Sequence, residues 1–442
     1  MYTQVSKLLL YSNLGENSIL VRLSQIFRDW EQGDAPKEQL TQRIFKEVKR
    51  LLDLATEYGF DVNLWHNYLT YLLMTNENSF TLTCERAGTS EGSVNHFAKG
   101  DLKIFRELFR FDFGPIEKDL GIDCFTTLSH YRAIPKKERR YNKNASDQIQ
   151  RVSALLEQAP DEDGMFGVIT DYYRAYGVGV FSFNRAFRIR RDEGGEVTFL
   201  PINNVDGITL SNLVGYELQK QKLRENTEAF LRGCPANNVL LYGDSGTGKS
   251  SSVKALINEY YDQGLRMIEI YKHQFRDLSD VIAQVKNRNY RYIIFIDDLS
   301  FEEDELEYKF LKAVIEGGVE TRPDNILIYA TSNRRHLIKE TWKDKNDMEF
   351  NGEVHRSDTV EEKLSLSSRF GVQINYSVPD RDEFLEIVEE LARRQGLSIG
   401  REELCQQANR WEIRHGGISG RTAQQFVNDL VGRANEQSMA DA

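Results

Sequence analysis

The sequence lacks a net positive charge, any paired cysteine spacing and any long apolar run. Acidic residues outnumber basic ones, 68 to 57 in 442 residues, and the net charge of −11 argues against nucleic-acid binding over the whole surface, although a local basic patch stays compatible. The N-terminal apolar run is far too short for a signal peptide, and no later run approaches a membrane span. The cysteines include no C-x-x-C pair, which is typical of reduced thiols rather than disulfides or structural zinc: Cys84, Cys124, Cys234 and Cys405. These absences predict a cytoplasmic protein without a membrane partner.

Residues 1–186 are predicted to form a mainly helical N-terminal domain. In LTQRIFKEVKRLLDLATEYGF and NLWHNYLTYLLM, apolar residues recur at three- and four-residue steps, the pattern of a helix that packs against a core. The aromatic cluster of Trp65, Tyr68 and Tyr71 is interpreted as core packing rather than a binding platform, because large aromatic side chains dominate buried contacts. Gly, Asn and Pro then break the periodicity, so residues 187–211 are predicted to be a linker with at most a short strand.

From residue 212 the sequence alternates short apolar runs with helical segments. The runs are NVLLYG (238–243), RMIEIY (266–271), YIIFIDD (292–298), NILIYATSN (325–333) and VQINYSV (372–378). Continuous apolar runs separated by helices are typical of a parallel sheet covered on both faces. Residues 212–379 are therefore predicted to form an αβα core around a five-stranded parallel sheet. Only helical patterns remain after it, which predicts a helical lid over residues 380–442.

The stretch YGDSGTGKSS (242–251) satisfies the phosphate-loop pattern G-x-x-x-x-G-K-[ST]. It follows an apolar strand and precedes a helical segment, so backbone N–H groups and the helix N-terminus are expected to face phosphate oxygens. Lys249 is expected to reach the β- and γ-phosphates of ATP, and the Ser250 hydroxyl to bind Mg²⁺. The predicted nucleotide contacts in this loop are Gly243, Ser245, Gly246, Thr247, Gly248, Lys249, Ser250 and Ser251.

Two carboxylates, Asp297 and Asp298, end the apolar run YIIFIDD. The C-terminal ends of parallel strands share one edge of a sheet, so both carboxylates are expected beside the phosphate loop. Asp297 is the candidate magnesium ligand, and Asp298 is the candidate residue that orients or deprotonates the attacking water. The alternative is a pair that only caps the following turn.

Six stretches, taken in order, resemble the ring-forming AAA+ ATPases: LVGYELQK, LLYGDSGTGKSS, IIFIDDLSF, YATSNRRHL, SLSSRFG and SGRTAQQF. More narrowly, the sequence resembles a bacterial AAA+ family known only as a domain of unknown function, which NLWHNYLTYLL and FTLTCERAG also fit. The resemblance covers most of the chain. It implies a P-loop ATPase core with a C-terminal lid, in a protein that assembles with itself into a ring or another homo-oligomer, with a hexamer expected.

The resemblance also implies roles outside the phosphate loop. Asn333 matches the sensor that hydrogen-bonds the γ-phosphate and the attacking water, and Arg421 matches the sensor arginine of the lid. Arg369 in SLSSRFG matches the arginine finger, which acts on the nucleotide of the adjacent subunit. Val214 and Gly215 match the segment that lines the adenine pocket. Three arginines on nearby loops are rival candidates for the finger: Arg322, Arg334 and Arg335.

One departure from the family pattern concerns catalysis. Asp298 stands where many AAA+ proteins have glutamate, and its shorter side chain predicts slow hydrolysis. The predicted function is ATP-driven remodelling of a protein client. Two alternatives stay open: a nucleic-acid loader or initiator, suggested by IDDLSF and the basic stretches 134–144 and 185–191, and a nucleotide-switched scaffold that rarely hydrolyses ATP. The loop with Tyr271 and Phe275 is where threading machines usually carry a pore aromatic, but neither aromatic is flanked by glycine, so threading stays open.

Overall fold

The computed structural model describes residues 1–88, 92–133, 143–202, 205–301, 305, 307–316, 323–333, 337 and 366–440. The chain forms two compact units, one made of Met1–Arg185 with Pro201–Val205 and the other of Ala186–Leu200 with Asp206–Ala442. Within the described residues, no helix is both long and apolar enough to cross a membrane.

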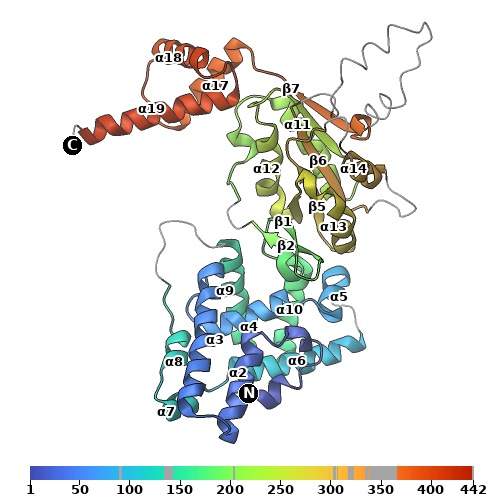
Figure 1. Cartoon of the computed structure of the whole chain (residues 1–442), viewed down its shortest axis with the longest axis vertical. Coiled ribbons are helices and arrows are strands. Elements are labelled where there is room, and N and C mark those ends of the chain that lie inside the picture. The colour runs from blue at the N-terminus through green and yellow to red at the C-terminus, as the bar shows by residue number, and fades with distance from the viewer. Residues whose placement is uncertain are drawn as a thin grey trace. The chain divides into compact units, whose positions relative to one another are not determined.

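The first unit is built from helices (Figure 1). They are α1 (Tyr2–Val5), α2 (Ile19–Gln32), α3 (Lys37–Tyr58), α4 (Leu64–Thr75), α5 (Ser79–Ala87), α6 (Ser93–Phe109), α7 (Gly114–Leu120), α8 (Cys124–Ser129), α9 (Lys143–Gln158) and α10 (Glu162–Tyr176), with 3₁₀ turns η1 (Ser12–Leu14) and η2 (Gly179–Phe181). In α3 the buried positions Leu40, Ile44 and Leu51 share one stripe, as the apolar spacing predicts. Trp65 and Tyr68 of α4 are buried, and the Trp65 indole N–H donates to the Leu108 carbonyl at 2.9 Å, so these aromatics are core residues.

The second unit contains a seven-stranded sheet with the order β2-β1-β4-β5-β6-β3-β7. Its strands are β1 (Ala186–Arg191), β2 (Val197–Pro201), β3 (Val239–Gly243), β4 (Leu265–Glu269), β5 (Arg291–Ile296), β6 (Ile326–Ser332) and β7 (Val372–Tyr376). All neighbours from β1 to β7 in this order pair in parallel. β5 and β6 are buried along almost their whole length, which explains their continuous apolar runs.

The sheet has two strands more than the five predicted, which correspond to β3–β7. β1 and β2 form a hairpin in the stretch predicted as a linker, joined by a turn at residues 192–196. Phe187 and Ile189 are buried, and the arginine between them faces outward, so β1 follows the two-residue period of a half-buried strand. The outward arginines and the glycines of the turn gave this stretch the composition of a loop.

Helices and short turns surround the sheet and lead into the lid (Figure 1). The core helices are α11 (Glu217–Leu231), α12 (Lys249–Tyr260), α13 (Leu278–Val285) and α14 (Glu307–Glu316), with 3₁₀ turns η3 (Leu210–Asn212), η4 (Tyr261–Gln263) and η5 (Lys272–Asp277). The lid consists of α17 (Arg381–Arg394), α18 (Arg401–Arg414) and α19 (Gly420–Ala440). Phe384, Val388 and Phe426 are among the residues that form its core, and Asp380 caps α17 by accepting from the Glu383 N–H at 2.9 Å.

The strand order brings three predicted site segments to one edge of the sheet. β5, β6 and β3 are neighbours and run in parallel, so their C-terminal ends meet at the same edge. Asp297 follows β5, Asn333 follows β6 and the phosphate loop follows β3. The topology therefore places these groups together before any side-chain contact is considered.

Candidate functional site

The phosphate loop connects β3 to the N-terminus of α12 through glycines in conformations that other residues rarely adopt. Gly243, Gly246 and Gly248 have φ angles of 130°, 78° and 90°. A Cβ at Gly243 would overlap the carbonyl oxygen of Tyr376, and one at Gly246 would lie 3.2 Å from the Cβ of Arg421. Glycine is therefore required for the turn and for the close approach of the lid.

Lys249 begins α12 and turns its ammonium back over the loop. Its Nζ donates to the carbonyl oxygens of Gly243 at 3.0 Å and Asp244 at 2.6 Å, and to Asn333 Oδ1 at 3.0 Å. Burial lowers the pKa of this ammonium, while the carboxylates of Asp244, Asp298 and Asp297 oppose the shift. The Lys249 ammonium thus bonds both to the phosphate loop and to Asn333, which follows β6.

Asp297 lies at the centre of a second group of polar contacts. Its Oδ1 accepts from the Ser250 hydroxyl at 2.5 Å and from the Thr331 hydroxyl at 2.6 Å, and the Lys254 ammonium lies 3.9 Å from Oδ2. The sequence prediction had placed Ser250 and Asp297 at one metal, and the structure brings their oxygens together. Hydroxyl and carboxylate oxygens suit a hard cation such as Mg²⁺.

Asp298 has a left-handed backbone conformation, with φ at 52°, which is uncommon for a residue other than glycine. Its N–H donates to the Thr331 hydroxyl at 3.0 Å, and its Oδ1 accepts from Asn333 Nδ2 at 2.8 Å. The carboxylate is therefore linked to Lys249 through the two ends of one carboxamide. This unusual backbone is held in place by neighbours from β6.

Thr331 is a site residue that the sequence interpretation missed. It is 1% exposed, and its hydroxyl contacts both Asp297 and Asp298. Alternation along a strand puts residues i and i+2 on the same side, so Thr331 and Asn333 belong to one row. The spacing of two residues between Thr331 and Asn333 in YATSN is the sequence signal that could have identified Thr331.

The lid contributes Arg421, close to the start of α19. Its backbone N–H donates to the Gly246 carbonyl at 3.0 Å, and the residue lines the cavity together with the phosphate loop. The helix begins at Gly420, so Arg421 lies in the first turn, as predicted. A cation in the first turn is destabilised by the helix dipole, so the Arg421 guanidinium is expected to interact with a group outside its own helix.

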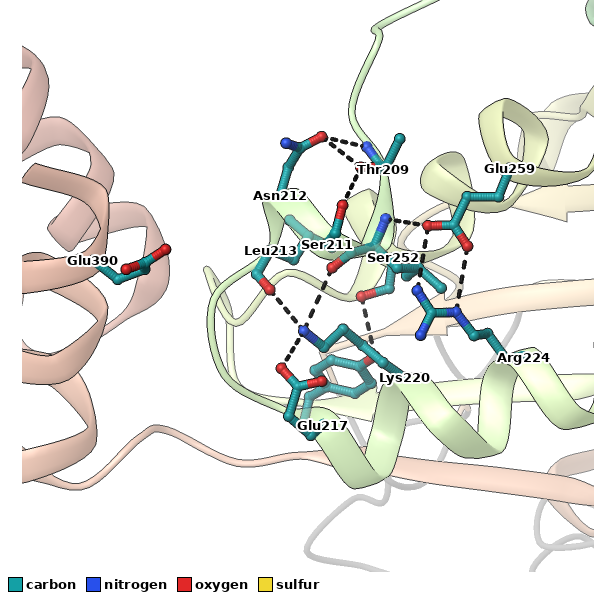
Figure 2. Close-up of polar contacts among 12 residues, drawn as sticks. Thr209, Ser211, Asn212, Leu213, Glu217, Lys220, Arg224, Ser252, Glu259 and Glu390 are labelled. Carbon is teal, nitrogen blue, oxygen red and sulfur yellow. Dashed lines mark hydrogen bonds and ion pairs between the residues drawn. The ribbon is translucent and has the colours of Figure 1, made fainter. Parts of the chain in front are cut away.

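A cavity of about 510 Å³ joins these groups to an apolar end. Val214 and Gly215 line that end, as the sequence predicted, and Ile387 and Leu391 of α17 lie beside them. Val214 packs against the lid core, and a Cβ at Gly215 would lie 3.8 Å from Ile387 Cδ1. The loop before this segment is fixed by polar contacts, which Figure 2 shows around Asn212 and Leu213. The cavity thus has a polar end at the phosphate loop and an apolar end beside the lid.

Arg369 lies outside the cavity that the described residues line. Its guanidinium forms an ion pair with Glu316 of α14 at 2.8 Å, and its side chain is 46% exposed. The rival fingers Arg322, Arg334 and Arg335 lie outside the described residues. Of the two candidate pore aromatics, Phe275 is buried against Phe301, whereas Tyr271 is 40% exposed.

A family model described as "Protein of unknown function (DUF815)" matches residues 182–434, more than half of the chain. The chain belongs to this family. The chain is also similar to curated proteins. It is 26% identical to the Cell division cycle protein 48 homolog of Archaeoglobus fulgidus over 262 residues, which cover 53% of this chain and 32% of that protein. It is 24% identical to the 26S proteasome regulatory subunit 6B homolog of Aspergillus niger, covering 46% of this chain and 49% of that protein.

Among solved structures, the Thermotoga maritima RuvB Holliday junction branch migration motor matches with a TM-score of 0.35 and 17% identity, over 53% of this chain and 66% of that chain. The chain spans less than half of the length of the two curated relatives named above. The parallel sheet, the phosphate loop after β3 and the distant sequence relatives confirm the predicted AAA+ P-loop fold.

Proposed function

We propose that this protein binds ATP with Mg²⁺ in the cavity between the phosphate loop and the lid, and that it hydrolyses the nucleotide slowly. The observation that carries the proposal is the convergence of Lys249, Asp298, Asn333 and Arg421, from four separate segments, at one cavity. Its polar end suits a triphosphate, and its apolar end suits a base. A curated relative is named as an ATPase, the human ATPase family gene 2 protein homolog A, at 26% identity.

Ser250 and Asp297 would hold the magnesium ion. Their oxygens lie 2.5 Å apart, and the Thr331 hydroxyl orients the same Asp297 oxygen from the other side. The bound ion would neutralise charge on the β- and γ-phosphate oxygens. Lys249 would leave its contacts with the loop carbonyls for the phosphate oxygens, since a triphosphate is the stronger partner for a cation.

Asp298 would act on the attacking water. The water oxygen would bond to the γ-phosphorus while the bond to the bridging oxygen of ADP breaks, and the Asp298 carboxylate would receive the water proton. Asn333 contacts both Asp298 and Lys249, so it would align the water with the γ-phosphate. The short carboxylate of Asp298 and its constrained backbone support slow turnover.

Arg369 would act on the nucleotide of a neighbouring copy. It is exposed, and in its own chain it pairs with Glu316 rather than with the cavity. An arginine that reaches the phosphates of another subunit adds little to binding but neutralises charge that develops during transfer, worth about 10³–10⁵ in rate. The active form would then be a homo-oligomeric ring, with a hexamer expected.

A protein client suits the surface better than nucleic acid. In the basic stretch of β1, Arg188 pairs with Glu269 at 2.8 Å and Arg191 pairs with Asp277 at 2.5 Å, so acidic partners already neutralise these charges. Curated relatives named as proteasome regulatory subunits also favour a protein client. If short DNA or RNA competes with a protein client for binding at physiological salt, the result would favour the nucleic-acid loader alternative instead.

The test is ATP hydrolysis by the purified chain at several protein concentrations. Lys249→Ala should abolish ATP binding, and Asp298→Asn should keep binding while stopping turnover. A mixture of Arg369→Ala and Asp298→Asn proteins should recover part of the activity, because each supplies the group that the other lacks. A rate that stays negligible at every concentration would favour the nucleotide-switched scaffold, and mixing that never restores activity would refute the role of Arg369.

A further inference from the structure

A short loop at residues 209–213, which we name the base-side loop, leads into the apolar end of the cavity. Figure 2 shows the polar contacts of this loop. Asn212 and Leu213 of this loop line the cavity, and Val214 and Gly215 follow directly. The position of the base-side loop therefore sets where the apolar end lies relative to the phosphate loop.

Lys220 of α11 is the main anchor. The residue is only 4% exposed, and its ammonium donates to the Leu213 carbonyl at 2.7 Å, the Leu210 carbonyl at 3.4 Å and Glu217 Oε1 at 2.5 Å. An ammonium has three donors, and here three acceptors face it. Lys220 also lines the cavity, but its three donors face these three acceptors, so we expect it to act on a nucleotide through the loop.

A second helix fixes the other side of the base-side loop. Glu259 of α12 accepts from the Leu210 N–H at 2.7 Å, and Arg224 of α11 holds Glu259 at 3.3 Å. Within the loop, Asn212 Oδ1 accepts from the Thr209 N–H at 2.7 Å. Figure 2 shows these contacts on the two sides of the loop, with Lys220 on one side and Glu259 on the other.

We propose that Lys220 is a positioning residue for the base of the nucleotide, and that it acts without affecting the grip on the triphosphate. The inference rests on the proposed function of the cavity. Without the ammonium, the carbonyls of Leu210 and Leu213 lose their charged hydrogen-bond partner. The loop would turn toward water, and Val214 and Gly215, which line the apolar end of the cavity, would move with it. The phosphate loop has its own anchors in β3 and α12 and would keep its shape.

The experiment compares two probes, ATP and inorganic tripolyphosphate, by calorimetry on the full chain. Lys220→Met keeps the length and apolar stem of the side chain but removes the ammonium. ATP affinity should fall about tenfold, as expected for loss of a buried hydrogen bond from a charged group. Tripolyphosphate affinity and kcat at saturating ATP should stay near their original values. Lys222→Met, an exposed position on the same helix, is the matched control and should change neither affinity.

A second variant guards against misfolding of the first. Glu259→Ala removes the anchor on α12 from a position outside the described cavity lining, and it should also weaken ATP more than tripolyphosphate. Equal loss of both probes in Lys220→Met and Glu259→Ala, or no loss in either, would overturn the inference. If the proposed function is wrong, the result is different. Lys249→Ala would then bind ATP and tripolyphosphate as well as the wild-type protein does.

Discussion

Asn333 Oδ1 accepts a hydrogen bond from the Lys249 ammonium at 3.0 Å, across a sequence separation of 84 residues. The other end of the same carboxamide donates to Asp298 at 2.8 Å. One side chain therefore connects the cation of the phosphate loop with the carboxylate proposed to act on water. Removal of Asn333 is therefore expected to lower turnover more than ATP binding.

Asn333→Ala is expected to lower kcat by about 10²–10³, as loss of one preorganised hydrogen-bond donor does in other enzymes, while ATP affinity changes only a few-fold. Lys249 and the backbone N–H groups of the phosphate loop can reach the phosphates without Asn333, so ATP binding should survive. Single-turnover hydrolysis and calorimetric ATP binding measure the two effects separately. A loss of affinity as large as the loss of rate would show that Asn333 contributes mainly to binding.

Thr331→Val is expected to raise the Mg²⁺ concentration for half-maximal hydrolysis about 10–100-fold, because residues that orient metal ligands typically contribute that much. The variant keeps the shape of the side chain but removes the hydroxyl that contacts Asp297 and Asp298. Thr331→Ser, which keeps the hydroxyl, should stay near wild type. If the serine and valine variants require the same Mg²⁺ concentration, the hydroxyl does not orient the site.

The polar end of the site could be predicted from the sequence because each of its parts ends a strand. The phosphate loop, Asp297 and Asn333 follow apolar runs whose C-terminal ends must share one edge of a parallel sheet. Arg421 and Val214 could be predicted only through the family resemblance, since no local pattern relates a lid helix to a loop that precedes the core.

The anchors of the site could not be predicted in the same way. Lys220 acts through carbonyl groups, which every residue has, so no residue type marks its partners. Thr331 is one of several small polar residues near strand ends; its two-residue spacing from Asn333 is a weak signal, and its contacts with two aspartates show its role. The hairpin of β1 and β2 was missed because three arginines and a glycine turn outweighed a short alternating pattern.

Glu316→Gln is expected to increase ATP hydrolysis at low protein concentration, by no more than about fivefold. Glu316 pairs with the exposed Arg369 at 2.8 Å, and an exposed ion pair contributes about 1 kcal/mol or less. Removing the charge would free Arg369 for a neighbouring copy. At high concentration, where copies are already assembled, the rate should equal that of wild type. Lower hydrolysis at every concentration would mean instead that Glu316 orients the arginine.

Arg394→Met is expected to weaken ATP binding about 3–10-fold by loosening the contact between the lid and the base-side loop, since a hydrogen bond from a charged group contributes about 1.5–3 kcal/mol before exposure reduces it. Arg394 donates to the Asn212 carbonyl at 2.8 Å and to Glu390 at 2.7 Å. Arg393→Met is the matched control, because Arg393 bonds to the same Glu390 at 2.8 Å.

The Arg394→Met variant also gives a prediction for the pH dependence of ATP affinity. Hydrogen bonds from Arg393 and Arg394 lower the pKa of Glu390 to about 2. A carboxyl with a lowered pKa keeps its ion pairs above its unfolded pKa and loses them only as pH falls through the lowered value. The difference in ATP affinity between wild type and Arg394→Met should therefore stay constant from about pH 6 to pH 8, measured by calorimetry. An affinity difference that disappears within that range would show that another titrating group, not Glu390, orients Arg394 toward the loop.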